Sequence, residues 1–431
     1  MKILVVGGGG REHAIAWKAA ASPLVGEVLV APGNAGTALE PRTRNMDIAA
    51  QDVDALVALA RRERVDLTIV GPEQTLVAGV VDRFEDAGLR CFGPTAEAAQ
   101  LEGSKAFAKA FLARHSIPTA AHGTFDDLDA ARAYVRTREL PLVIKADGLA
   151  AGKGVIVAAT LDEADAALAS MLQEGAFGAA GNTVIVEEFL AGEEASFIAL
   201  VDGTRIAPLA SSQDHKTRDD GDRGPNTGGM GAYSPAPVVT EPVHRRIMEE
   251  VMVPAVEGLA ADGIHYRGFL YAGLMIDAAG APRVLEFNCR LGDPETQPIL
   301  FRLNSDLVAL CLGCFDGALG STPILWDPRA AVGVVMASAG YPGPYEKGKL
   351  IAGLPTASGP AAKVFHAGTK RTPAGIVTDG GRVLCAVGLG ATVGEARKLA
   401  YRVVHGVHWD GAFWRGDIGY RAVARESTAR A

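Results

Sequence analysis

Short apolar runs alternate with amphipathic segments along the first hundred residues of the chain. The apolar runs are rich in β-branched residues and too short for helices, which is typical of buried strands. The pattern predicts strands at residues 3–6, 27–31, 67–70 and 90–92, with helices that include residues 12–20 and 53–62. Such an alternation is typical of a doubly wound parallel sheet, in which ligands bind at the carboxyl ends of the strands.

Glycine-rich loops follow these predicted strands, at residues 7–13, 32–36, 71–73 and 93–95. The first loop lacks the G-x-G-x-x-G spacing of a dinucleotide site, because Glu12 or His13 stands where the third glycine is required. The acidic residue expected after the second strand is also absent, since Ala31 and Pro32 stand there. We expect a phosphate-bearing sugar at the start of the first helix instead, with Arg11 as a bidentate donor. Glu12 and His13 are expected to be solvated.

A loop between two further apolar runs has the composition of a phosphate-binding flap. Residues 142–144 and 155–157 predict two strands, and the loop between them carries three glycines, Gly148, Gly152 and Gly154, together with Lys145 and Lys153. Free N–H groups beside lysines suit polyphosphate oxygens. No Lys-Ser/Thr pair and no helix follow, which excludes a Walker A loop and favours a flap. Taken alone, the loop is equally compatible with a flexible hairpin and two solvated lysines.

Carboxylates occur on two later predicted strands. Residues 184–190 predict a strand with two carboxylates, Glu187 and Glu188, at its end. Residues 283–290 predict another strand, on which Glu286, Asn288 and Arg290 share one face. A carboxylate and an amide oxygen two residues apart are hard ligands suited to Mg²⁺ shared with substrate phosphates. The alternative is that Glu286 and Asn288 form a hydrogen-bonded polar pair near a domain boundary.

The order of these patterns along the whole chain predicts three domains. Residues 1–103 form the amino-terminal sheet, and residues 104–326 form a second α/β domain with a small lid at about 120–190. Residues 327–431 are strand-rich and carry no pattern that indicates chemistry, so we assign them to packing. Within the second domain, residues 211–235 are rich in glycine, proline and polar groups, which favours a long substrate loop.

Composition narrows the class of protein. With 431 residues, 48% hydrophobic and 21% charged, the chain is typical of a globular protein of several domains. The net charge of -8 argues against a general nucleic-acid binder. No apolar run of 18 residues is present, so no membrane helix is expected. The five scattered cysteines, including Cys311 and Cys314 in an apolar run, indicate core thiols in a reducing cytosol.

The lysine strand, glycine flap, Glu-Glu strand and Glu-x-Asn strand, in that order, resemble the ATP-grasp superfamily. Seven motifs bring the resemblance closer: Gly-Gly-Arg-Glu-His, Ala-Pro-Gly-Asn-Ala-Gly, Gly-Pro-Glu, Lys-Ala-Asp-Gly-Leu-Ala-Ala-Gly-Lys-Gly, Ser-Gln-Asp-His-Lys, Gly-Pro-Asn-Thr-Gly-Gly-Met-Gly-Ala-Tyr-Ser-Pro and Glu-Phe-Asn-Cys-Arg-Leu-Gly-Asp-Pro-Glu-Thr-Gln. From residue 1 to about 425, the chain resembles the phosphoribosylamine–glycine ligase family, also called glycinamide ribonucleotide synthetases. The resemblance implies an α/β protein with an amino-terminal doubly wound parallel sheet, an ATP-grasp core with an inserted lid and a strand-rich carboxyl-terminal domain.

The same resemblance implies an activity and its partners. The family joins glycine to 5-phosphoribosylamine with ATP and Mg²⁺, through glycyl phosphate, in purine biosynthesis. Mn²⁺ is an alternative metal. The expected partners are these small molecules, with neither nucleic acid nor membrane, and the sequence is compatible with a monomer.

Residue roles follow from the resemblance by position. Roles at the reacting atoms are implied for Lys145, Asp214 and Arg290. Nucleotide binding is implied for Lys105, Lys145, Gly148, Gly152, Lys153, Gly154, Glu187, Glu188, Leu190 and Glu194. Binding of the other substrates is implied for Gly9, Gly10, Arg11, Glu73, Asp214, Lys216, Asn226, Gly229, Arg290 and Asp293. Metal binding is implied for Glu286 and Asn288, but the second carboxylate of many relatives is missing, since residues 272–275 carry none.

Two other readings of the sequence compete with this one. The first is a different ATP-grasp carboxylate–amine ligase or a carboxylase, which the glycine-rich segment at residues 224–235 opposes. The second is a non-catalytic nucleotide- or nicotinamide-binding module, which the broken glycine spacing and the retained Lys145, Glu286 and Asn288 oppose.

Overall fold

A computed structural model describes residues 1–149, 154–174, 181–321, 323–355 and 359–428. The amino-terminal sheet has the strand order β3-β2-β1-β4-β5, with parallel pairing throughout. Its strands are β1 (Lys2–Gly7), β2 (Glu27–Pro32), β3 (Thr43–Asn45), β4 (Leu67–Val70) and β5 (Cys91–Phe92). Its helices are α1 (Gly10–Ala20), η1 (Thr37–Leu39), α2 (Val53–Glu63), α3 (Glu73–Val77), α4 (Val80–Asp86) and α5 (Gln100–Gly103). The predicted doubly wound parallel sheet is confirmed; β3 is an edge strand that the sequence pattern missed.

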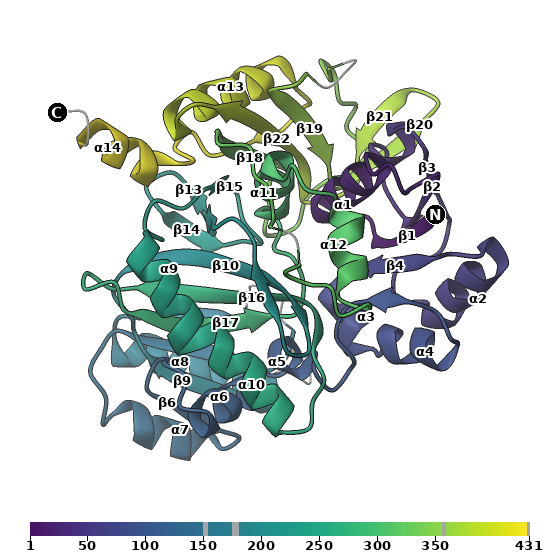
Figure 1. The fold of residues 1–431 in the computed structure, drawn as a ribbon. Helices are drawn as coiled ribbons and strands as arrows, with labels where there is room; N and C mark the ends of the chain where they lie inside the picture. Colours follow the sequence, from purple (N-terminus) through teal and green to yellow (C-terminus); the bar gives the residue numbers. More distant parts are fainter. Residues whose placement is uncertain (150–153, 175–180, 322, 356–358, 429–431) are drawn as a thin grey trace.

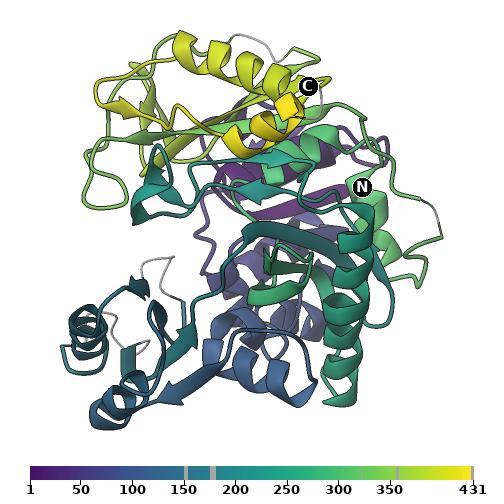
Figure 2. The ribbon, with the colours of Figure 1, turned by 90° about the vertical axis from the view of Figure 1, so that its left-hand side faces the viewer.

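A small antiparallel sheet stands out from the rest of the ribbon (Figure 2). Its order is β6-β9-β7-β8, and it contains the strands that carry the lysine and the two glutamates. The strands are β6 (His122–Phe125), β7 (Leu142–Ala146), β8 (Val155–Ala158) and β9 (Val184–Glu188), with helices α7 (Leu128–Val135) and α8 (Leu161–Leu172). Helix α6 (Lys105–Arg114) precedes it and is capped by Ser104, whose hydroxyl accepts the Phe107 N–H.

The central sheet has the order β11-β10-β16-β17. Its strands are β10 (Glu193–Asp202), β11 (Ile206–Pro208), β16 (Arg267–Ile276) and β17 (Pro282–Asn288). Helices α9 (Glu241–Ile247) and α10 (Val253–Ala261), joined by the π-helical turn Met248–Met252, run across one face of it (Figure 1). Ile247, Val256 and Leu259 from these helices share a buried cluster with Phe197 and Leu270 of the sheet. This packing fixes β17, the strand that carries Glu286 and Asn288.

A third sheet combines strands that lie far apart in the sequence. Its order is β12-β15-β18-β22-β19, and β23 also pairs with β18. The strands are β12 (Gln213–Asp214), β15 (Gly231–Ser234), β18 (Ala330–Ser338), β19 (Ala362–His366), β22 (Arg382–Gly390) and β23 (Ala412–Phe413). Hairpins β13 (Thr217–Asp219) with β14 (Arg223–Asn226) and β20 (Thr369–Thr372) with β21 (Gly375–Thr378) stand beside it. Helices α11 (Thr296–Arg302), α12 (Leu307–Gly313), α13 (Val393–Gly406) and α14 (Tyr420–Thr428) complete the described elements.

The structure corrects one expectation about residues 211–235. They do not form an open loop, because β12 to β15 occupy much of the segment. The reason is long-range pairing: Gly231 to Ser234 pair with Val334 to Ala331, so the glycine-rich segment becomes part of the third sheet. Strands from both sides of residue 327 therefore share one sheet.

Two further expectations from the sequence concern membrane-spanning helices and the cysteine thiols. Among the described residues, no helix is long and apolar enough to span a membrane. All five cysteines lie in the described part of the chain, where they are buried and free of disulfides.

Candidate active site

Lys145 stands at the end of β7 in a buried chain of charges. Its ammonium lies 2.9 Å from Glu187 Oε1 and donates to the Leu285 carbonyl at 3.2 Å. The other oxygen of Glu187 accepts from Lys109 at 2.9 Å, and Lys109 also donates to the Thr119 hydroxyl. Burial lowers the pKa of Lys109. One carboxylate thus holds two lysines, so Glu187, for which nucleotide binding was predicted, lies among cations in this structure.

Lys105 connects helix α6 to the base of the flap. Its ammonium donates to the Gly148 carbonyl at 2.7 Å, and burial lowers its pKa, with Lys145 acting in the same direction. Asp147 holds the same junction, since its carboxylate accepts from the Ser104 hydroxyl and the Ala106 N–H. Gly148 adopts φ +85°, and the Gly154 carbonyl accepts the Ala146 N–H. Gly152 and Lys153 lie outside the described residues.

A pocket of about 230 Å³ lies beside the end of β9. Leu190, Glu188, Met275 and Arg283 are among the residues that line it. Glu188 pairs with Arg283 at 3.1 Å and accepts the Ala121 N–H, so its carboxylate is held at the rim. An apolar wall beside a polar rim is the usual lining of a site for a small organic molecule.

Glu286 and Asn288 lie on one face of β17, where the Asn288 amide approaches Glu286 Oε1 at 3.5 Å. Burial raises the pKa of the Glu286 carboxyl, but Lys216, Lys145, Lys105 and Arg290 together hold it below its usual range. An ionised carboxylate beside an amide oxygen fits a hard divalent cation. In the described parts of the chain, no three His, Cys, Asp or Glu side chains are grouped as a complete metal site.

Arg290 departs from the predicted alternation. Strand β17 ends at Asn288, and Arg290 turns toward two carboxylates: Glu73 accepts at 3.2 Å and Glu102 lies at 2.6 Å. Burial raises the pKa of Glu102 to about 7 against the attraction of Arg290. Burial alone would also raise the pKa of Glu73, but Arg290 and Arg11 lower it to about 2.

The start of α1 is more enclosed than the sequence suggested. Glu12 and His13 were expected to be solvated, but both are buried, at 2% and 1% exposure. Glu12 accepts the Gly9 N–H at 2.6 Å and pairs with Arg11, so a side chain of the same helix caps its amino terminus. Gly7 and Gly71, at the ends of β1 and β4, lie against Glu12, and His366 of β19 donates its backbone N–H to His13, so both side chains are covered. A sugar phosphate at Gly9, Gly10 and Arg11 would therefore meet N–H and guanidinium groups already engaged with Glu12.

Replacing Glu73 by glutamine should lower stability in a pH-dependent way. The folded-state pKa of Glu73 lies below its unfolded value, so its ionic contribution is full above about pH 5 and fades as the pH falls toward 2. The depressed pKa corresponds to about 3 kcal/mol at neutral pH. Chemical denaturation of both proteins between pH 7 and pH 3 measures it. A difference in unfolding free energy that stays constant over this range would contradict the ion pairing with Arg290.

A second group of side chains lies between β10 and β12. Lys216 lies 2.6 Å from Glu194 and 3.1 Å from Asp214, and these two carboxylates raise the pKa of Lys216 against the effect of burial. Burial raises the pKa of Asp214, and Glu194 adds to the effect. Glu194, for which nucleotide binding was predicted, thus forms one cluster with the predicted substrate residues Asp214 and Lys216.

Glu295 belongs to the same cluster and was missed as a site residue. It is buried at 3% exposure, and its Oε1 accepts from the Tyr271 hydroxyl at 2.7 Å and the Ser196 hydroxyl at 3.0 Å. Burial raises its pKa, and the nearby Asp214 adds to the shift. The signal in the sequence that could have identified Glu295 as a site residue was its place in the Asp-Pro-Glu motif. Lys109 was missed as well, and the signal for it was its position four residues after Lys105 on the same helix.

The carboxyl-terminal part of the chain also reaches this site. Arg382 of β22 donates to the backbone carbonyls of Gly228 and Asp293, and its other nitrogen lies 3.1 Å from the Asp293 carboxylate. Burial raises the pKa of Asp293, but Arg382 and Arg11 outweigh it and lower that pKa. The sequence carried no signal for Arg382, because its partners are about 90 and 150 residues away.

Close packing explains the glycines around Asp293. Gly229 adopts φ +113°, and a Cβ there would lie 2.4 Å from Pro294 Cδ. A Cβ at Gly10 would lie 2.5 Å from Gln297 Nε2, which donates to Asp293. Asn226 ends β14 at the far side of the same segment, paired with Thr217.

Replacing Arg382 by alanine should weaken binding of the substrates other than ATP. Loss of the guanidinium frees the segment at Gly228 and leaves Asp293 without its cation, so we expect a KM for glycine or phosphoribosylamine about tenfold higher. The KM for ATP should change little. Arg371→Ala, at an exposed arginine on the neighbouring β20, is the matched control. If Arg382→Ala raised the KM values of all three substrates equally, this would contradict a role of Arg382 that is limited to the substrates other than ATP.

Lys145 lies on one antiparallel sheet, and Glu286 and Asn288 lie on the adjoining one. This arrangement, with the glycine-rich sequence that follows Lys145, defines an ATP-grasp protein. A solved biotin carboxylase from Campylobacter jejuni has the same fold, with a TM-score of 0.74 at 14% identity over 95% of this chain and 92% of that one. Family models for phosphoribosylglycinamide synthetase match in three parts: the N domain at residues 1–102, the ATP-grasp domain at 103–296 and the C domain at 331–421. The chain belongs to the phosphoribosylglycinamide synthetase family, and the resemblance seen in the motifs is confirmed.

Relatives over the full length agree with this assignment. The chain is 64% identical to the phosphoribosylamine–glycine ligase of Allochromatium vinosum, over 99% of this chain and 100% of that one. It is 61% identical to the ligase of the same name from Vibrio cholerae, over 99% of both. The crystal structure of phosphoribosylamine–glycine ligase from Thermotoga maritima matches with a TM-score of 0.86 at 36% identity, over 97% of this chain and all of that one.

Proposed function

We propose that the protein ligates glycine to 5-phosphoribosylamine, with ATP cleaved to ADP and phosphate, in purine biosynthesis. The observation that carries the proposal is that Lys216, Lys145, Lys105 and Arg290 all act on the Glu286 carboxyl and together hold its pKa below its usual range. Such a group of cations suits a triphosphate whose charge is shared with one ionised carboxylate. The full-length relatives bearing the name of this ligase support the same substrates.

In the proposed reaction, the glycine carboxylate attacks the γ-phosphorus of ATP, which gives glycyl phosphate and releases ADP. The amine of phosphoribosylamine then attacks the carbonyl carbon of glycyl phosphate, phosphate leaves, and the amine loses a proton to form the amide. The chain need not supply a nucleophile, because positioning and charge neutralisation provide most of such catalysis. Lys105 and Lys145 bind the triphosphate, and the Glu194–Lys216–Asp214 cluster orients the glycine. The flap that begins at Gly148 excludes water from the acyl phosphate.

A divalent cation completes this arrangement. Glu286 and Asn288 would hold it, with phosphate oxygens and water as its remaining ligands, and it would neutralise charge on the transferring phosphate. We propose Mg²⁺ as the usual ion, with Mn²⁺ as a substitute, since both accept hard oxygen ligands. We also propose that the protein acts as a monomer in the cytosol, where its five free thiols stay reduced.

Release of ADP tests the proposal. ADP should form only when glycine and freshly generated phosphoribosylamine are both present, and mass spectrometry should detect glycinamide ribonucleotide. A parallel panel replaces glycine with bicarbonate or other amino acids, and phosphoribosylamine with ammonia. ADP formation with bicarbonate, or with glycine and ammonia alone, would assign the chain to another ATP-grasp reaction. Absence of ADP with every combination would contradict an enzymatic role.

A further inference from the structure

A second pocket, of about 630 Å³, lies between α1 and β19. Its volume falls within the range of about 300–1,000 Å³ that is typical of sites for small organic ligands. None of the described residues that line it belongs to the candidate active site. The amino-terminal sheet and the third sheet both contribute to it, so the pocket exists only where these two parts of the chain meet.

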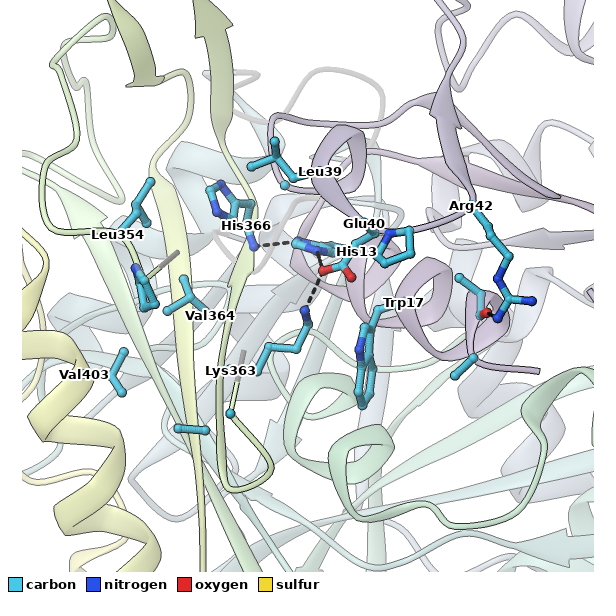
Figure 3. Close-up of a pocket in the computed structure, with 17 residues that line it drawn as sticks. His13, Trp17, Leu39, Glu40, Arg42, Leu354, Lys363, Val364, His366 and Val403 are labelled. Carbon is cyan, nitrogen blue, oxygen red and sulfur yellow. Dashed lines mark hydrogen bonds and ion pairs between the residues drawn. The ribbon is translucent and has the colours of Figure 1, made fainter. Parts of the chain in front are cut away.

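Apolar side chains form much of its wall (Figure 3). Leu354, Val364 and Val403 lie on one side, and Trp17 lies on the opposite side. Trp17 is partly exposed and is held by Phe301 and Phe365, with ring centroids 5.7 and 5.6 Å away. A fixed indole beside aliphatic side chains suits a flat ring system.

Glu40 is the centre of the polar part of the pocket. Its Oε1 accepts from the Lys363 ammonium and from His13 Nε2 at 3.0 Å (Figure 3). His13 Nδ1 accepts the backbone N–H of His366 at 2.7 Å, which places the proton of the neutral ring on Nε2. Burial lowers the pKa of His13, although Glu40 opposes the shift. His13 is therefore a neutral donor to Glu40.

The cations of the pocket are already engaged. Lys363 pairs with Glu40, and the Arg42 guanidinium donates to the Ala20 and Val25 carbonyls. Burial lowers the pKa of His366 to about 3, so this ring is neutral at physiological pH. A phosphate or carboxylate placed here would meet no uncompensated cation among the described lining residues, and an anionic ligand is disfavoured.

Two polar atoms remain available to a ligand. Glu40 Oε2 and His366 Nε2 have no hydrogen-bond partner in the part of the chain that the structure describes. The Glu40 side chain is 11% exposed and His366 is 6% exposed, and both line the pocket. Their free atoms can therefore bond to water or to a ligand there. The carboxylate oxygen accepts only, so its partner must bring an N–H or O–H donor.

We propose that this pocket binds an uncharged, planar heteroaromatic molecule that carries N–H donors and has the size of a nucleobase or nucleoside. Its ring lies between Trp17 and the aliphatic wall, and its N–H group donates to Glu40 Oε2. The site is separate from the nucleotide site on β7, β9 and β17, and the proposal does not depend on the reaction proposed above.

Calorimetry with matched nucleosides tests the ligand class. The full chain is first saturated with ATP and Mg²⁺ without glycine, so that the ATP site is filled, and is then titrated with adenosine, guanosine and cytidine. At least one should bind with one-to-one stoichiometry. Purine riboside, which lacks the amino group of adenosine, should bind about tenfold more weakly than adenosine, because Glu40 loses its donor. AMP should bind no better than adenosine.

Two tryptophan variants on α13 test the location. Val403→Trp fills the pocket and should weaken nucleoside binding by about tenfold or more. Arg402→Trp adds the same side chain at the exposed neighbouring position and should leave binding unchanged. Equal binding by wild type and Val403→Trp would place the nucleoside elsewhere and overturn the proposal. Absence of saturable binding by all three nucleosides, or tighter binding of AMP than of adenosine, would overturn it as well.

Discussion

Replacing Glu286 by glutamine should lower ADP formation at saturating ATP by about 10²- to 10³-fold. It should also shift activation to higher magnesium concentrations. Glutamine keeps the shape of the side chain but removes the charge. Lys216, Lys145 and Lys105 hold the pKa of the Glu286 carboxyl below its usual range, so the substitution removes the negative charge on which these cations act, at the proposed metal ligand.

A magnesium titration separates metal binding from general damage. Glu249→Gln, at an exposed carboxylate on the helical segment that covers the same sheet, should behave as wild type. Both variants should unfold at similar temperatures if Glu286 acts on the metal and not on the fold. Wild-type activity of Glu286→Gln at every magnesium concentration would mean that the metal lies elsewhere, and the roles assigned to β17 would have to be withdrawn.

Replacing Lys145 by methionine should lower kcat/KM for ATP by about 10²- to 10³-fold. Lys145 is only 8% exposed, so its interaction with a phosphate is weakly screened by water. The loop sequence alone was equally compatible with a solvated lysine. Because Lys145 is buried against Glu187, we now expect the melting temperature to fall as well.

Lys109→Met provides the matched control for this loss of stability. It removes the other cation of Glu187, 2.9 Å from the second carboxylate oxygen. The two variants should therefore lose stability to a similar extent, whereas kcat/KM should fall by no more than about tenfold in Lys109→Met. Equal kinetic losses in both variants would show that the lysines act through Glu187 alone and that Lys145 is not a direct phosphate ligand.

The sequence by itself determined the elements and the family. Runs such as residues 3–6 and 67–70 are short, apolar and β-branched, and they form β1 and β4 because local pattern and burial agree there. Helix α2 begins at Val53 as predicted, since its cap is encoded locally: the Asp52 carboxylate accepts the Ala55 N–H. Motif residues such as Glu286 and Asn288 could be found in the same way, because their spacing is a property of the single strand β17.

Only the tertiary structure decided which of these residues are paired, buried or shared between sheets. Arg290 is neutralised by Glu73 and Glu102, more than 180 residues away along the chain, so its partners could not be found from its own neighbourhood. Residues 231–234 looked like part of an open loop, because their strand partner, β18, lies a hundred residues later. Glu40 meets Lys363 only after the two ends of the chain pack together. Charge state and solvent exposure depend on neighbours in space, and local spacing carries no information about neighbours that the chain brings from a distance.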